Sequence, residues 1–157
     1  GGILARRDRP DDLHALEAQG IRLIDVVVVN LYPFARAAAD PGTTVEALIE
    51  EIDIGGPSLV RAAAKNFRDV VVVVDPADYR ATMTALESPD GPSVDYRLSL
   101  ACKAFAHTRS YDDTIAVALS AVEVTDGWRK EGRCSSCSLF ETDFGAHFLL
   151  PWPVGCS

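Results

Sequence analysis

Residues 21–30 read IRLIDVVVVN, a nearly continuous run of β-branched side chains that ends at Asn30. Such a run, without alternating polar residues, is typical of a strand buried on both faces of a parallel sheet. Residues 70–74, VVVVV between two aspartates, form a second run of the same kind. The two runs predict two neighbouring parallel strands in the core of the fold.

Segments with helical spacing of apolar residues surround these two strands. They cover residues 11–19, 43–52, 59–65, 76–86 and 94–119. Thr43 or Thr44 suits the N-cap of the second helix, and Pro57 and Ser58 suit the first turn of the third. Helices that alternate with apolar strands indicate an α/β fold with a parallel sheet. Such sheets usually hold about five or six strands, so we expect further strands in a missing portion of the protein or in a partner chain.

The composition narrows the class of protein. The chain has 157 residues, 48% of them hydrophobic, which suffices for the core of one domain. Its net charge of -8 argues against a broad nucleic-acid-binding face. No apolar run approaches the length of a membrane span. Cys102 stands alone while the other cysteines crowd near the end of the chain, unlike a disulfide framework. We therefore expect a cytoplasmic protein with no nucleic-acid or membrane partner.

The first candidate site follows the first predicted strand, at residues 30–34 (NLYPF). Ligands of parallel α/β sheets bind beyond the carboxyl ends of the strands. There Asn30 can donate and accept hydrogen bonds, and Tyr32 offers a phenol. On these residues alone, a structural Asn turn beside a packed aromatic ring is an equally good interpretation.

The second candidate site is residues 52–58 (IDIGGPS), which lead into the helix that carries Arg61 and Lys65. The two glycines let the backbone approach a ligand, and Asp53 can act as a general acid or base. Arg61 and Lys65 lie four residues apart and so share one helix face. Spacing alone favours the plainer alternative, in which Asp53 caps a turn and the two cations form a solvated stripe.

Together these segments resemble the successive signatures of IMP cyclohydrolase, in that family's order and spacing. The matching segments are residues 30–34 (NLYPF), 52–56 (IDIGG), 61–66 (RAAAKN), 103–105 (KAF), His107-Thr108 and Tyr111-Asp112. Residues 1–7 (GGILARR) also resemble a segment of the family, without the His that precedes it there. The resemblance covers about residues 1–119.

The resemblance implies a methylglyoxal-synthase-like α/β domain that closes the ring of formylated aminoimidazole carboxamide ribotide to inosine monophosphate (IMP) and releases water. By position it implies a catalytic set, Asp53, Lys65 and Tyr32, and a nucleotide-binding set, Asn30, Ile54, Gly55 and Gly56. Asp53 would take the carboxamide proton, Lys65 and backbone N–H groups would stabilise the oxyanion, and Tyr32 would orient the base. A purine nucleotide substrate, a homodimer and the absence of any metal or cofactor are also implied.

The chain departs from the family at both ends. The family's phosphate-binding first strand and a further active-site lysine would precede residue 1, and its formyltransferase domain is not matched here. We therefore expect residues 1–122 to be an N-terminally truncated cyclohydrolase domain, inactive alone, and residues 123–157 to be an unrelated or out-of-frame tail, poorly ordered. The tail's possible zinc ligands, Cys134, Cys137, His147 and Cys156, fit no strong metal pattern.

Two other hypotheses remain open. One is a noncatalytic nucleotide-binding or phosphate-binding module of the same fold, although the linked motifs favour cyclohydrolase. The other is an incomplete translation product without stable activity. His107 is expected to serve helix packing, as a His within a long helix commonly does, and it is left out of the catalytic set.

Overall fold

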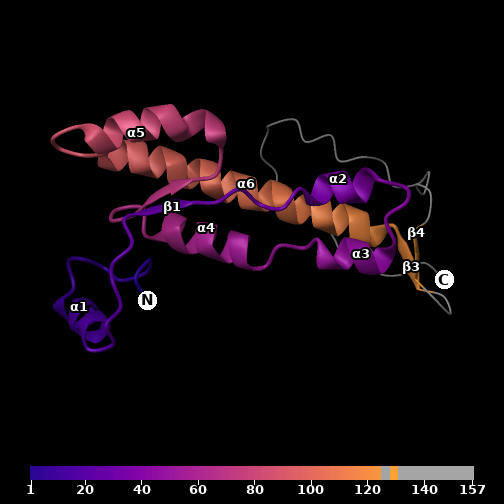
Figure 1. The fold of residues 1–157 in the computed structure, drawn as a ribbon, viewed down its shortest axis with the longest axis horizontal. Coiled ribbons are helices and arrows are strands. Elements are labelled where there is room, and N and C mark those ends of the chain that lie inside the picture. The colour runs from indigo at the N-terminus through magenta and orange to yellow at the C-terminus, as the bar shows by residue number, and fades with distance from the viewer. Residues whose placement is uncertain (125–127, 131–157) are drawn as a thin grey trace, which may run out of the picture.

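The computed structural model describes residues 1–124 and 128–130 (Figure 1). In chain order its elements are α1 (Pro10–Glu17), β1 (Val26–Val28), α2 (Phe34–Ala39), α3 (Val45–Glu50), α4 (Gly55–Lys65), β2 (Val71–Val73), the 3-10 helix η1 (Pro76–Asp78), α5 (Tyr79–Glu87), α6 (Val94–Ser120), β3 (Val122–Val124) and β4 (Trp128–Lys130). The α/β class with parallel strands is confirmed.

The two valine runs pair as a parallel ladder, with Val26 beside Val71 and Val28 beside Val73. β1 is shorter than predicted because the preceding backbone is used elsewhere: the N–H of Ile24 donates to Gly2 O at 3.1 Å. All of β2 is buried, whereas Val28 of β1 is 52% exposed. In the described residues this sheet holds only these two strands, so the predicted further strands remain a prediction.

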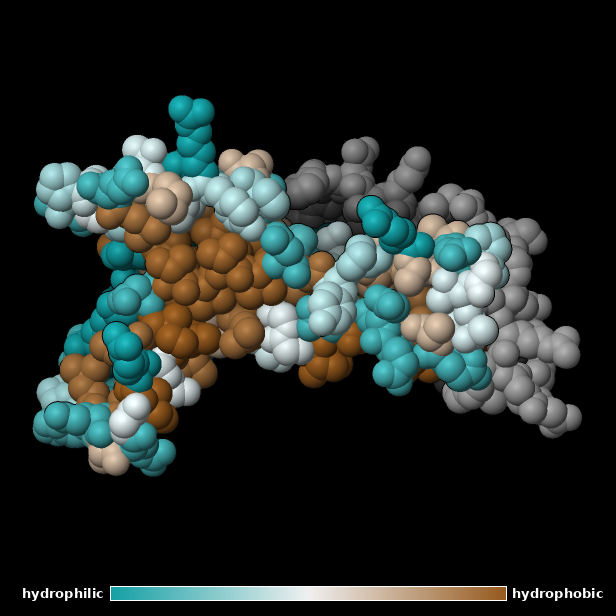
Figure 2. All heavy atoms as spheres, viewed as in Figure 1, coloured by the Kyte–Doolittle hydropathy of each residue, from teal (hydrophilic) through white to brown (hydrophobic). Residues whose placement is uncertain are grey.

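The core lies where α4 and α6 pack against each other and against β2. Val60, Ala63 and Ala64 of α4 are at most 1% exposed, and Ala104 of α6 is fully buried. Small alanine side chains let the two helices and the sheet approach closely. Figure 2, drawn from the same side as Figure 1, shows hydrophobic side chains gathered at the surface between α1 and α5, where β1 lies.

The helices follow the predicted positions with three differences. Thr44 caps α3 by accepting the Ala47 N–H at 3.2 Å, as one of the two predicted alternatives. α4 begins at Gly55 and not at Leu59. α2 was not predicted; it is only 6 residues long and lacks a side-chain cap, and it is anchored by Phe34, which is 1% exposed. Residues 76–86 divide into η1 and α5.

Beyond α6 the chain forms a short antiparallel pair, β3 with β4, and β4 lies beside α3. β4 belongs to the segment predicted to be a separate tail. Residues 125–127 and 131–157 lie outside the described residues, and with them the four possible zinc ligands of the tail. No helix in the described part of the chain has both the length and the apolar character needed to cross a membrane.

Candidate functional site

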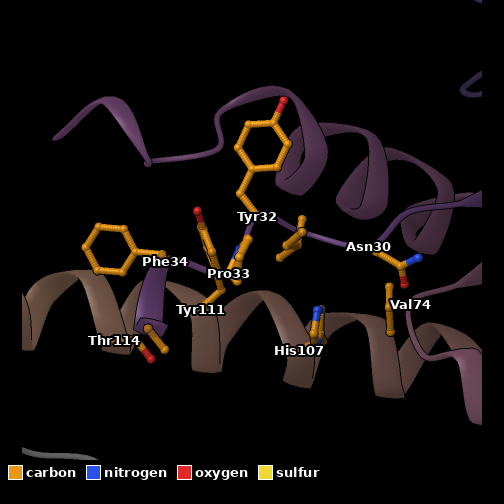
Figure 3. Close-up of a pocket in the computed structure, with 10 residues that line it drawn as sticks. Asn30, Tyr32, Pro33, Phe34, Val74, His107, Tyr111 and Thr114 are labelled. Carbon is orange, nitrogen blue, oxygen red and sulfur yellow. The ribbon is translucent and has the colours of Figure 1, made fainter. Parts of the chain in front are cut away.

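A cavity of about 270 Å³ opens where the residues after β1 and β2 meet α2 and α6 (Figure 3). Its lining residues are Asn30, Leu31, Tyr32, Pro33, Phe34, Ala35, Val74, His107, Tyr111 and Thr114. This is the position at which open parallel α/β sheets bind their ligands. The first predicted site, residues 30–34, therefore forms one wall of a real cavity.

The side chains of residues 30–34 are not equivalent. Tyr32 lies at the rim: Figure 3 shows its ring pointing away from α6, and the residue is 61% exposed. Phe34 is buried and its ring meets that of Tyr111 edge to face, with centroids 6.3 Å apart. Asn30 is held by α5, because its side-chain amide donates to Tyr79 Oη at 3.1 Å. Tyr32 is thus the aromatic group free to meet a ligand, whereas Phe34 is structural.

Asp53 is half-buried and fixed at two points. Its Oδ1 accepts the N–H of Gly56 at 2.7 Å, which satisfies one of the free donors at the start of α4. Its own N–H donates to Tyr111 Oη at 2.8 Å. The carboxylate therefore satisfies an N–H in the first turn of α4 from the residue before the N-cap, Ile54, and the Asp53 backbone adjoins the cavity wall through Tyr111.

Gly56 is the glycine that this arrangement requires. A Cβ atom built on Gly56 would overlap the Asp53 carboxylate and would lie 2.8 Å from Leu31 Cδ2, closer than real Cβ contacts. A Cβ atom on Gly55 would meet nothing within 4 Å. The second predicted site thus uses one of its two glycines for the close packing of Asp53 against the cavity-lining Leu31.

Lys65 lies at the other end of α4 from Asp53. A helix rises about 1.5 Å per residue, so Lys65 is about 15 Å along the axis from Gly55. Both Arg61 and Lys65 are exposed, and the Arg61 guanidinium lies 5.8 Å from the centre of the Phe105 ring. Within one chain Asn30 and Tyr32 therefore line the cavity, Asp53 adjoins it through Tyr111, and Lys65 lies apart. Ile54 is 74% exposed at the start of α4.

One face of α6 contributes residues that were not in the predicted site. Lys103, His107 and Tyr111 recur every four residues and so lie on one face of the helix. His107 and Tyr111 line the cavity from below in the view of Figure 3, and His107 is half-buried. The four-residue spacing within the matched segments was the available signal, but only the tertiary structure aims this face at the ends of the strands.

Lys103, one turn of α6 before His107, forms two ion pairs. Its Nζ lies 2.6 Å from Asp75 Oδ2 and 2.7 Å from Asp78 Oδ2. The hydrogen bond from Lys103 is the main cause that lowers the pKa of Asp75, and the N–H of Ala77 adds to it. In turn, hydrogen bonds to Asp75 and then Asp78 raise the pKa of Lys103. The charge of Lys103 is thus used to join α6 to the segment after β2.

Asn66, in the matched segment RAAAKN, has a structural task. Its side-chain amide donates to Ile3 O at 2.9 Å and to Ala5 O at 3.1 Å, which ties residues 1–7 to the end of α4. Among residues 1–124 and 128–130, no three His, Cys, Asp or Glu side chains gather as a metal site.

Part of this chain is similar in sequence to known proteins. Residues 63–142 match a family model described as "AICARFT/IMPCHase bienzyme". The chain is 55% identical over 115 residues to the "Bifunctional purine biosynthesis protein PurH" of Staphylococcus saprophyticus, covering 73% of this chain and 23% of that protein. It is 49% identical over 122 residues to the protein of the same name from Listeria monocytogenes, covering 78% and 24%.

A solved structure is also similar. The "Crystal structure of ForH" matches with a TM-score of 0.64 and 38% sequence identity, covering 76% of this chain and 61% of that one. By contrast, the chain spans about a quarter of the length of the two curated relatives. The relatives therefore extend well beyond the part that carries the cavity described here.

Proposed function

The chain belongs to the AICARFT/IMPCHase bienzyme family, and on that premise we propose that it supplies the IMP cyclohydrolase part of such an enzyme. The reaction closes the ring of formylated aminoimidazole carboxamide ribotide to give IMP and water. The observation that carries the proposal is the position of Asp53: its N–H binds Tyr111 in the wall of a cavity at the carboxyl ends of two parallel strands, and its carboxylate is fixed by Gly56. The matched segments NLYPF and IDIGG form this region.

Ring closure needs a proton acceptor and a group that stabilises negative charge. The carboxamide nitrogen attacks the formyl carbon and loses one proton, while the formyl oxygen gains charge. That oxygen takes up protons and leaves as water as the formamido nitrogen gives up the second proton and forms the C=N bond of the new ring. Asp53 Oδ1 is used for capping, which leaves Oδ2 as the carboxylate oxygen for the proton. Because both reacting groups belong to one substrate molecule, positioning supplies much of the rate.

The start of α4 is suited to stabilise the oxyanion, since helix N-termini carry partial positive charge. The Gly56 N–H already donates to Asp53, and Pro57 has no N–H. The backbone part of the predicted oxyanion role therefore falls to Gly55. Lys65 keeps its predicted role only as a hypothesis, because α4 places it about 15 Å away along the helix. A Lys65→Ala variant tests it separately.

The base of the substrate fits the cavity and its rim. Ligand pockets of proteins commonly measure ~300–1,000 Å³, and a cavity of about 270 Å³ suits a heterocyclic base with its ribose phosphate outside. Tyr32 at the rim would orient the base, with Asn30 and the backbone of Ile54 and Gly56 as further contacts. The proposal includes a cytoplasmic homodimer that needs no metal or cofactor for this step.

A ring-closure assay tests the proposal. The formylated substrate is supplied directly, so no formyl transfer is required, and IMP formation is followed by chromatography. The chain is assayed alone and as a hybrid protein in which it replaces the segment of the Listeria monocytogenes relative that aligns with it. We expect IMP formation by the hybrid. A folded hybrid that binds IMP without forming it would indicate a noncatalytic nucleotide-binding module instead.

A further inference from the structure

Tyr111 contacts the site at several points through one side chain (Figure 3). Its Oη accepts the N–H of Asp53 at 2.8 Å and lies 3.4 Å from Glu51 O, to which it donates. Its ring lines the cavity and meets the Phe34 ring edge to face. A single residue of α6 therefore joins the α3–α4 connection to the cavity wall.

The connection between α3 and α4 depends on this phenol. Residues 51–54 lie between the two helices and belong to no helix or strand, so their backbone groups need partners outside regular structure. Tyr111 serves an N–H and a C=O of this connection with one hydroxyl group. Asp53 is consequently held at its backbone by Tyr111 and at its carboxylate by Gly56.

We infer that Tyr111 is a positioning residue for Asp53: its hydroxyl fixes the peptide that carries the proton acceptor, and its ring forms the adjoining wall. This inference rests on the proposed function, because it assigns a purpose to the position of Asp53. Tyr32 and Tyr79 do not share the role, since the hydrogen bond of Tyr79 goes to Asn30 and Tyr32 lies exposed at the rim.

The test is Tyr111→Phe, which removes the hydroxyl and keeps the ring. The matched control is Tyr96→Phe, which removes a hydroxyl that bonds to Thr82 Oγ1 at 2.9 Å, away from the cavity lining. Amide hydrogen exchange of the 157-residue chain is measured by NMR. We expect exchange at Asp53 to quicken by roughly 2- to 10-fold in Tyr111→Phe, the range that follows from the net strength of one hydrogen bond. Exchange at β2 should stay unchanged.

An assay of ring closure distinguishes a residue that positions Asp53 for the reaction from one that only supports the fold. In the hybrid protein, Tyr111→Phe should lower kcat while KM changes less than about twofold, because the ring that borders the cavity is retained. Unchanged exchange at Asp53 would overturn the inference. The inference would also be overturned if Tyr111→Phe showed faster exchange at Asp53 but a normal rate of ring closure, while Asp53→Asn slowed the reaction. If Asp53→Asn also leaves the rate unchanged, the proposed function of this site fails, and the role of Tyr111 fails with it.

Discussion

The backbone N–H of Gly56 donates to Oδ1 of Asp53 over 2.7 Å, so a single hydrogen bond joins the first turn of α4 to the carboxylate of the candidate site. The plainer interpretation of Asp53, that it caps a turn, is therefore confirmed. It does not compete with a chemical role, because capping uses one carboxylate oxygen and leaves the second. The hydrogen bond fixes the orientation of the carboxylate.

Gly56→Ala should disturb this arrangement, because the added methyl group meets Leu31 and the Asp53 carboxylate. We expect the free energy of unfolding to fall by about 1–3 kcal/mol, the usual cost of overpacking. Gly55→Ala is the matched control: its methyl group faces open space, so stability should stay the same or rise by less than about 1 kcal/mol. Urea unfolding followed by circular dichroism measures both. Equal effects of the two variants would refute the assignment of Gly56.

Asn66→Ala should release the N-terminal segment from the end of α4. The variant loses two hydrogen bonds, to Ile3 O and Ala5 O, each with a net value of about 0.5–1.5 kcal/mol. Trypsin should then cut after Arg6 and Arg7 faster than in the parent chain. Gln19→Ala, which removes an exposed amide side chain, should leave the cleavage rate unchanged. Cleavage as slow as in the parent chain would show that other contacts hold this segment.

Lys103→Met should lower the melting temperature in a pH-dependent way. The pKa of Asp75 is lowered from its ordinary value of 3.8, so its stabilising contribution is present above that pH and is lost as the pH falls through the lowered pKa. The pKa of Lys103 is raised from 10.5, so its contribution is present below that pH and is lost as the pH rises past the raised value. The difference in melting temperature should be largest between about pH 5 and 9.

Thermal scans at pH values from about 2 to 9 check the prediction. Arg109→Met serves as the control, because Arg109 and Asp113 form a more exposed pair at 3.4 Å and such surface pairs stabilise little. If the difference in melting temperature between the parent chain and Lys103→Met were as large at about pH 2 as at neutral pH, the ion-pair account would be contradicted.

The sequence was a good guide to the layers of the fold and a weaker guide to the site. Uninterrupted valines identified β2 because a strand buried on both faces tolerates no polar residue. α2 escaped notice since 6 residues without a cap leave little local signal. The early start of α4 changed the predicted site most, because it sets the position of Lys65. The predicted helix covered residues 59–65 with Pro57 and Ser58 in its first turn, whereas the observed helix starts at Gly55, so Lys65 lies about 15 Å along the axis from that start.

His107 and Tyr111 show what only tertiary structure supplies. Their four-residue spacing places them on one face of α6, yet the same spacing occurs on many solvated helices. It is the packing of α6 against β2 and α2 that turns this face toward the cavity. Conversely, Asn66 resembles a site residue by its motif, but its side chain binds the backbone of residues 3 and 5.

The most direct test of the central claim is the rate of IMP formation by Asp53→Asn in the hybrid protein, beside Asp90→Asn as a charge-matched change in an exposed loop. The Asn variant keeps an oxygen that can accept the Gly56 N–H, so the fold should survive. Loss of a general base commonly costs 10²–10⁴-fold, and we predict a fall of at least about 100-fold for Asp53→Asn with no change for Asp90→Asn. A folded Asp53→Asn protein that forms IMP at the parent rate would contradict the account.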